Sequence, residues 1–214
     1  MTHILRALAV PTALAATLAL ASCGTSSNSN TSAGGSGNSA MMTSAPATGG
    51  TSATGAKNAA DVTFATDMIP HHAQAVAMAD MAPKQAADPR VRALATKIRQ
   101  AQAPEIARMS GWLTGWGAAV PATDSGHEMS GMGAQTGGMM SAQEMTDLGK
   151  ATSSAFDRMW LQSMTKHHVG AVATARTELA QGLNADSKKL AQSIIDSQSA
   201  EIAEMKSILA GIPG

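Results

Sequence analysis

Two histidine doublets are the residues of this chain best suited to chemistry. His71-His72 and His167-His168 occur in the same setting, because Met68 and Met164 each stand three residues before a doublet. Imidazole nitrogens and thioether sulfurs bind soft and borderline metal ions such as copper. A lone buried histidine is more often a hydrogen-bonded core residue, but this doublet occurs twice in register. We therefore interpret the doublets as candidate metal ligands.

A second repeated pattern adds carboxylates and further methionines. Gln102-x-x-Glu105-Ile106-Ala107-x-Met109 recurs as Gln198-x-x-Glu201-Ile202-Ala203-x-Met205. Glutamate is rarely buried without a partner, so Glu105 and Glu201 on an apolar stripe require either a metal ion or a hydrogen bond to histidine. Methionine at helical spacing is more often core filler than ligand. The candidate ligands from the two patterns are Met68, His71, His72, Glu105, Met109, Met164, His167, His168, Glu201 and Met205.

The elements that position these residues form two copies of one unit, 96 residues apart throughout (His71 to His167, Glu105 to Glu201). Apolar periodicity predicts helices over residues 59–82 and 89–113 in the first copy, and over 154–181 and 186–209 in the second. Asp88-Pro89 is typical of a helix start. Each copy is a helical hairpin that cannot bury its apolar face alone. The sequence therefore predicts an all-α fold, a four-helix bundle made of two hairpins.

Two details of the helices bear on the candidate site. Pro70 and Pro104 fall inside predicted helices, yet the equivalent residues of the second copy are Lys166 and Ala200. We therefore expect the helices to continue through both prolines, with kinks confined to the first copy. Consecutive residues on a helix diverge by about 100°. Each doublet thus places either one histidine inside and one at the rim, or both across a groove.

The N-terminal quarter of the chain predicts export. Residues 1–22 carry one early arginine and an apolar run that is short for a transmembrane helix, as in a secretory signal peptide. Cys23 is the only cysteine and follows Leu20-Ala21-Ser22, a pattern that resembles a lipoprotein cleavage site. The alternative is an ordinary signal peptide with an incidental cysteine. Residues 23–57, almost all Ser, Thr, Gly, Ala and Asn, predict a flexible tether.

The folded domain is predicted over residues 58–214. It comprises a first repeat (58–113), a Gly- and Met-rich loop (114–140) and a second repeat (141–210), which opens on a capping box from Ser141 to Glu144. Exposed methionine in a Gly-rich loop has no packing role, and it suits Cu(I). A low-complexity spacer that drifted toward methionine is an equal alternative. The candidate loop ligands are His127, Met129, Met132, Met139 and Met140.

Composition narrows the function classes. The formal net charge is zero and aromatic residues make up 2% of the chain, so nothing favours nucleic-acid binding. A ferritin-like di-metal oxidase uses Glu-x-x-His motifs, and the chain contains none. A non-catalytic helical scaffold for a protein partner is a further alternative, in which the histidines and glutamates would satisfy each other in the core.

The doubled pattern D-x-x-F-x-x-x-M-x-x-H-H followed by Q-x-x-E-I-x-x-M resembles the bacterial domain-of-unknown-function family 305 (DUF305). The resemblance covers about residues 58–210, with tryptophan in place of phenylalanine in the second copy. It implies a ferritin-like four-helix fold, an extracytoplasmic location, copper as the ligand and no established reaction. We therefore expect a copper-binding lipoprotein for copper handling or resistance, held at the bacterial membrane by lipid on Cys23, and not an enzyme.

Overall fold

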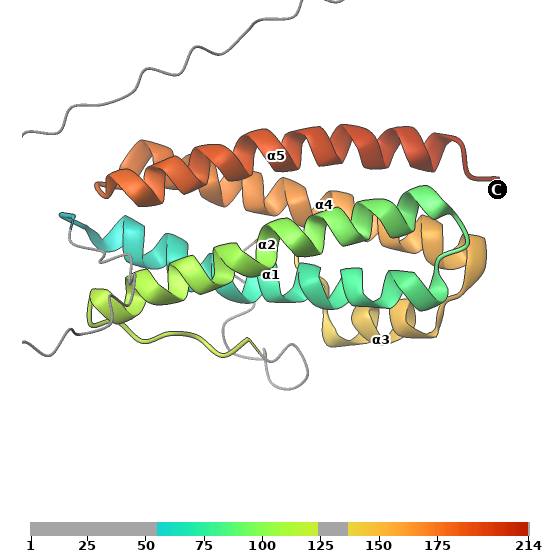
Figure 1. Ribbon diagram of the computed structural model, residues 1–214, viewed down its shortest axis with the longest axis horizontal. Coiled ribbons are helices and arrows are strands. Elements are labelled where there is room, and N and C mark those ends of the chain that lie inside the picture. Colours follow the sequence, from blue (N-terminus) through green and yellow to red (C-terminus); the bar gives the residue numbers. More distant parts are fainter. Residues whose placement is uncertain (1–54, 124–136, 214) are drawn as a thin grey trace, which may run out of the picture. The chain divides into compact units, whose positions relative to one another are not determined.

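The structure is a computed structural model that describes residues 55–123 and 137–213. Its helices are α1 (Ala59–Gln85), α2 (Pro89–Gly115), α3 (Ala142–Lys150), α4 (Ser153–Gln181) and α5 (Ala185–Ala210). The four long helices lie side by side in a bundle, and the short α3 packs on its outside (Figure 1). The predicted all-α bundle is confirmed, and the described residues contain no strand. None of their helices is apolar over enough length to cross a membrane.

Side-chain caps mark where α2, α3 and α5 begin. The Ser141 hydroxyl accepts the N–H of Glu144, and the Glu144 carboxylate accepts the N–H of Ser141, which is the predicted capping box. Asp88 caps α2 in front of Pro89, also as predicted. Asn184 accepts backbone N–H groups at the start of α5 in the same way. Because such signals are local, the predicted helix ends agree with the structure to within three residues.

The prolines do not interrupt their helices. Pro70 lies inside α1 and Pro104 inside α2, and both helices continue beyond them, as predicted. An interior proline costs about 3 kcal/mol through its missing N–H and its ring. Burial on both sides of Pro70 offsets this cost, since Ile69 and His71 are completely buried. Packing in the bundle therefore decides the local structure here, over helix propensity.

Helices α1 and α4 cross in opposite directions at the middle of the bundle. On one side of the crossing, residues 64–69 of α1 pack with residues 171–175 of α4 in an apolar cluster. On the other side, residues 75–82 of α1 pack with residues 156–164 of α4 in a second cluster. Helix α2 pairs with α1 and α5 pairs with α4. The two hairpins therefore meet with the histidine doublets between the two apolar clusters.

The repeated aspartates fasten each hairpin to the turn of the other. Asp61, in the first turn of α1, accepts the N–H of Asn184 at 2.8 Å, just before α5. Its equivalent Asp157, in α4, accepts the N–H of Asp88 at 2.9 Å, just before α2. Asp88 and Asn184 are themselves equivalent positions of the two copies. These reciprocal charge-assisted bonds relate the hairpins by an approximate two-fold axis.

A buried glutamate departs from this symmetry. Glu178 in α4 is 1% exposed, whereas the equivalent residue of the first copy is Ala82. Burial, and then the neighbouring Asp61, raise the pKa of Glu178 to about 7. Burial alone would also raise the pKa of Asp61, but the backbone N–H groups that it accepts outweigh burial and lower that pKa. Of these two neighbouring acids, Glu178 is therefore the one that holds a proton more readily.

We predict that Glu178→Gln stabilises the protein at alkaline pH. A glutamate whose folded pKa lies above its ordinary 4.5 contributes stability that is complete below about 4.5 and is lost as pH rises through about 7. Glutamine keeps an N–H donor at this position without the charge. The free energy of unfolding in urea should therefore exceed that of the wild type by on the order of 1 kcal/mol at pH 8, and by much less at pH 5.

The exposed Glu204 of α5 provides the control for this prediction, because Glu204→Gln removes a surface carboxylate that pairs with Lys97. That variant should change the free energy of unfolding little at either pH. An equal effect of Glu178→Gln at pH 5 and pH 8 would contradict the assignment of the proton.

Candidate metal centre

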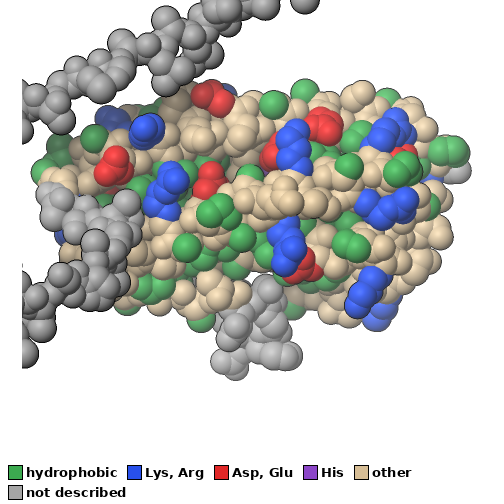
Figure 2. Space-filling model, in the orientation of Figure 1, with side chains coloured by type: hydrophobic (Ala, Val, Ile, Leu, Met, Phe, Trp, Pro, Cys, Tyr) green, Lys and Arg blue, Asp and Glu red, His purple; other side chains and the backbone are tan. Residues whose placement is uncertain are grey.

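The four doublet histidines form one buried layer where α1 and α4 cross. His71, His72, His167 and His168 all have zero exposure. The rings of His71 and His167 face each other across the crossing, with centroids 3.7 Å apart and planes tilted by 40°. The view of one face in Figure 2 shows no histidine at the surface. Neither predicted orientation is correct, because no histidine lies at the rim and none lines a groove.

Both members of a doublet are buried because each faces a different helix. His71 and His167 turn toward each other between the hairpins. His72 turns toward α2 of its own hairpin, where its Nε2 lies 2.7 Å from a carboxylate oxygen of Glu105. His168 does the same toward α5, with its Nε2 at 2.8 Å from Glu201. The two side chains of a doublet diverge by about 100°, but α1 and α4 are surrounded by other helices at this point, so both side chains are buried.

The His–Glu bonds show what partner the two repeated glutamates have on an otherwise apolar stripe. Each carboxylate has a histidine partner, as one of the two sequence interpretations required. The Glu105 side chain is 17% exposed and the Glu201 side chain 6%, so the two equivalent pairs differ in their access to water. In a neutral imidazole the Nε2–H donates to the carboxylate, which leaves the lone pair on Nδ1. The glutamates thereby orient His72 and His168 with Nδ1 free.

Several nitrogens of this layer have no hydrogen-bond partner among the described residues. They are both ring nitrogens of His71 and of His167, and the Nδ1 atoms of His72 and His168. Leaving a buried polar group unpaired costs about 1–3 kcal/mol. A layer of histidines that served only as core would be expected to satisfy these atoms. Their number and their proximity make the layer a candidate site for a ligand.

The histidines that face each other are held uncharged. Burial first, and then the neighbouring imidazoles His72 and His168, lower the pKa of His71 to about 3. The same causes, burial and then His71, lower the pKa of His167 well below its ordinary value. The backbone carbonyls of Gly137 and His167 lie near enough to favour protonation of His71, although neither reaches hydrogen-bond geometry, and they do not reverse the shift. Neutral imidazole is the form that binds metal ions.

The methionines of the repeat lie on both sides of the layer. Met68 and Met109 belong to one apolar cluster and Met164 and Met205 to the other, all with zero exposure. The Met205 sulfur lies 3.7 Å from the Thr165 hydroxyl, at the distance of a weak hydrogen bond. All four therefore fill the core in this structure. Their thioethers lie on either side of the imidazole layer and pack against apolar side chains.

The layer is compact as it stands. Among the described residues, no three His, Cys, Asp or Glu side chains are already arranged around a common point as metal ligands. The reason is visible in the contact between His71 and His167, since rings 3.7 Å apart leave no room for an ion between them. The donor set suits copper, and a bound ion would require these rings to separate.

Only part of the Met-rich loop falls within the described residues. His127, Met129 and Met132 lie outside them, as does Cys23. The segment of residues 137–140, which we call the strap, runs along the crossing of α1 and α4. Met139 in it is partly exposed, and Met140 is 8% exposed and packs in an apolar cluster. The prediction that loop methionines are exposed is therefore wrong for Met140.

Sequence reasoning missed two residues beside the layer, Gln74 and Gly170. Both occupy the second variable position after a doublet, where the repeat pattern carries no shared residue. Gln74 binds the backbone of Met140, and Gly170 lies against Gly137. A glutamine among buried alanines and a glycine in mid-helix were the available signals.

Comparison with known proteins shows the family to which this chain belongs. The family model described as domain of unknown function (DUF305) matches residues 61–209. A DUF305 structure from Streptomyces coelicolor is 36% identical, with a TM-score of 0.63, over 71% of this chain and 92% of that chain. One from Deinococcus radiodurans is 29% identical, with a TM-score of 0.62, over 72% and 97%.

CopM is also similar to this chain. In its Cu(II)-bound form it is 34% identical over 70% of this chain and 95% of that chain, with a TM-score of 0.60. Its Cu(I)-bound and Ag-bound forms have also been solved. No curated protein sequence matches the chain.

We predict that the metal-free protein loses stability as pH falls below about 6.5. A histidine whose folded pKa is depressed contributes stability above its ordinary pKa of 6.5, and this is lost as pH falls toward about 3. Each such histidine adds up to about 1.4 kcal/mol per pH unit to the slope. Urea unfolding between pH 7 and pH 4 should show a steeper decline for the wild type than for the double variant His71→Leu/His167→Leu. Parallel declines would refute the assignment.

Proposed function

Because the chain belongs to the DUF305 family, we propose that it is an extracytoplasmic lipoprotein that binds copper ions for copper handling or resistance. The observation that carries the proposal is the layer of four buried histidines with unpaired nitrogens at the crossing of the two hairpins. The likeness to CopM, solved with Cu(I), Cu(II) and silver, supports copper over harder cations.

The proposed donors follow from the chemistry of the layer. His71 and His167 offer unpaired ring nitrogens, and His72 and His168 offer Nδ1. Glu105 and Glu201 act as orienting partners that hold Nε2 of these last two rings, as carboxylates do behind many metal-bound histidines. The thioethers of Met68, Met109, Met164 and Met205 add soft donors on either side.

Binding without reaction fits these roles better than catalysis. Both repeated glutamates are engaged by histidine, so neither is free to bridge two metal ions as in a di-metal carboxylate oxidase. The copper ion is therefore proposed as cargo that the protein takes up and releases. A purely structural role for the histidines, in a scaffold for a protein partner, is less favoured because a finished core would not leave their nitrogens unpaired.

The proposed location rests on the start of the chain. Residues 1–22 have the pattern of an export signal, and Cys23 follows the small residues at its end. Lipid on Cys23 would hold the protein at the membrane.

We predict that Cu(I) binding depends on the doublets. In competition with a Cu(I) chelator, the double variant His71→Ala/His167→Ala should lose at least about 100-fold in affinity, because two borderline donors are removed. Met68→Leu/Met164→Leu should lose less. Met78→Leu is the matched control, since Met78 is equally buried but is threonine in the other copy.

The same protein should melt at a higher temperature with copper than with chelator. A ligand present at 100 times its dissociation constant stabilises the folded state by about 2.7 kcal/mol. Melting that is indifferent to copper, together with equal affinity for all variants, would favour the scaffold alternative.

We predict that Cys23→Ser abolishes membrane attachment of the exported protein. Lipid transfer requires the cysteine thiol, and serine does not replace it. In the wild type the protein should fractionate with membranes and carry a mass increase on the N-terminal peptide. The variant should be found in the soluble extracytoplasmic fraction. If wild type and variant fractionate alike, the lipoprotein assignment is wrong.

A further inference from the structure

The strap, residues 137–140, is fastened to α1 by a two-point bond. The Gln74 side-chain oxygen accepts the N–H of Met140 at 2.8 Å. The Gln74 amide nitrogen donates to the carbonyl of the same Met140, also at 2.8 Å. Both bonds are buried, and together they pair one amide side chain with one residue of backbone. Gln74 thus holds the C-terminal end of the strap through its side chain, and the backbone hydrogen bonds of α1 take no part.

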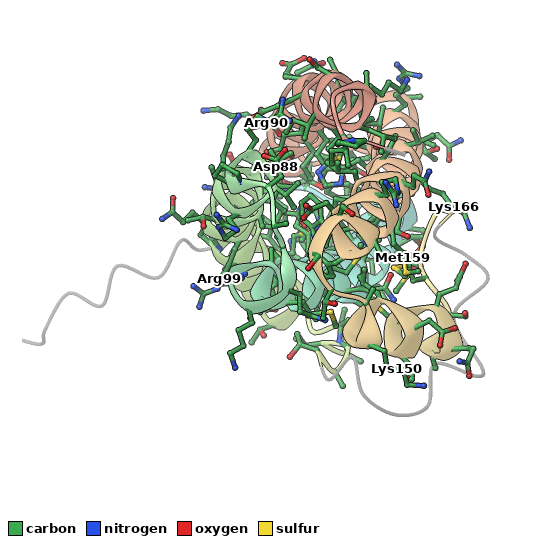
Figure 3. The ribbon with its side chains drawn as sticks, turned by 90° about the vertical axis from the view of Figure 1, so that its right-hand side faces the viewer. Asp88, Arg90, Arg99, Lys150, Met159 and Lys166 are labelled. Carbon is green, nitrogen blue, oxygen red and sulfur yellow. The ribbon has the colours of Figure 1, made fainter. Side chains whose placement is uncertain are left out.

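The other end of the strap is pressed directly onto the backbone of α4. A Cβ added to Gly170 would lie 1.4 Å from the carbonyl oxygen of Gly137. A Cβ added to Gly138, whose φ is +93°, would lie 2.3 Å from the carbonyl oxygen of Lys166. Only glycine permits such close contact on both sides and this backbone conformation. Figure 3 shows that the Lys166 side chain itself projects outward from α4.

The repeat shows why one strap can cover a two-fold crossing. Gln74 and Gly170 are equivalent positions of the two copies, each two residues after a doublet. A single strap has no two-fold symmetry, so it cannot make the same contact with both positions. It presents Met140 to Gln74 and Gly137 to Gly170. In one copy the position supplies a side chain that binds the strap, and in the other it supplies the space the strap needs. The Gly137 carbonyl that lies against Gly170 is also next to the ring of His71.

We propose that the strap is the gate of the histidine layer, and that Gln74 is the latch that sets how fast a metal ion passes it. This inference rests on the copper-binding function proposed above. All four histidines have zero exposure, so an ion reaches them only when something moves. Lifting the strap breaks the two bonds to Gln74 and leaves the helices intact. Moving α2 or α5 would instead break a His–Glu bond and open an apolar cluster.

The gate makes a kinetic prediction that is separate from affinity, because neither Gln74 nor Gly170 is a proposed ligand. Cu(I)-loaded protein is mixed with excess bathocuproine disulfonate, and the transfer of copper is followed by absorbance. Gln74→Ala should transfer copper at least tenfold faster, with an equilibrium affinity within about threefold of the wild type. Gly170→Ala should act in the same direction, since it displaces the strap while alanine favours the helix.

Gln85→Ala is the matched control. Gln85 is also a glutamine of α1 whose amide donates to backbone carbonyls, but those carbonyls belong to Leu148, Gly149 and Ala151 at the end of α3. Losing these bonds loosens the connection after the strap and leaves the latch intact. Its transfer rate should equal that of the wild type.

A measurement without metal separates the gate from the copper function. Diethyl pyrocarbonate modifies accessible imidazoles, and mass spectrometry reports its rate at each histidine. In the metal-free protein, His71 and His167 should react at least tenfold faster in Gln74→Ala than in Gln85→Ala. If the wild type binds no copper but the modification rates still differ between Gln74→Ala and Gln85→Ala, the proposed copper function is wrong. The strap would then still be shown to control access to the histidines. Copper binding with unchanged transfer and modification rates in both strap variants would overturn the gate and favour entry past Glu105.

Discussion

The contact between the His71 and His167 rings is the constraint on which the rest of the structure depends. It lies where α1 and α4 cross, and it puts imidazoles where a bundle of this size would ordinarily place leucine or alanine. Burial keeps both rings neutral, so the crossing carries no repulsive charge at neutral pH. The apolar clusters then pack to either side of a polar centre. A shift along α1 would separate the two rings and place each of them against the apolar side chains of a neighbouring cluster.

The arrangement also explains the division of labour within each repeat. The second histidine of a doublet is bound by a glutamate of its own hairpin, and the first meets the opposite hairpin. The glutamates are therefore internal to each half, whereas the central pair exists only once the halves combine. Of two adjacent histidines, one therefore stabilises its own hairpin and the other contributes to the contact between the hairpins. A residue inserted between the two histidines would turn one of them by about 100° and separate these roles.

Much of the fold could be predicted because the signals that specify it are local and occur twice. Helix ends followed from Asp88-Pro89 and from the Ser141–Glu144 capping box, and the second copy showed that Pro70 and Pro104 do not end their helices. The candidate histidines were also visible in the sequence. Their environment was not, since the burial of both members of a doublet depends on which helices face them.

Contacts that join positions without a shared pattern escaped prediction for a similar reason. Gln74 and Gly170 differ in type, so the repeat gave no signal for them, although the strap contacts both. Glu178 replaces an alanine of the first copy, and its pKa is raised by burial and then by Asp61, which is far away in the sequence. The repeat identified what the two halves share. Positions at which the halves differ, such as Gln74 and Gly170, make contacts that only one half has, and the repeat cannot predict those contacts.

The reciprocal bonds of Asp61 and Asp157 have a consequence for the origin of the molecule. Each aspartate completes a turn that belongs to the other half, so neither half alone contains a finished set of backbone partners. An isolated hairpin would recover every one of these bonds by pairing with a second copy of itself, as in an isologous homodimer. The present chain is what fusion of such a dimer would yield. In a single chain the two halves can differ at positions where a homodimer must be identical, and the strap lies at one such position.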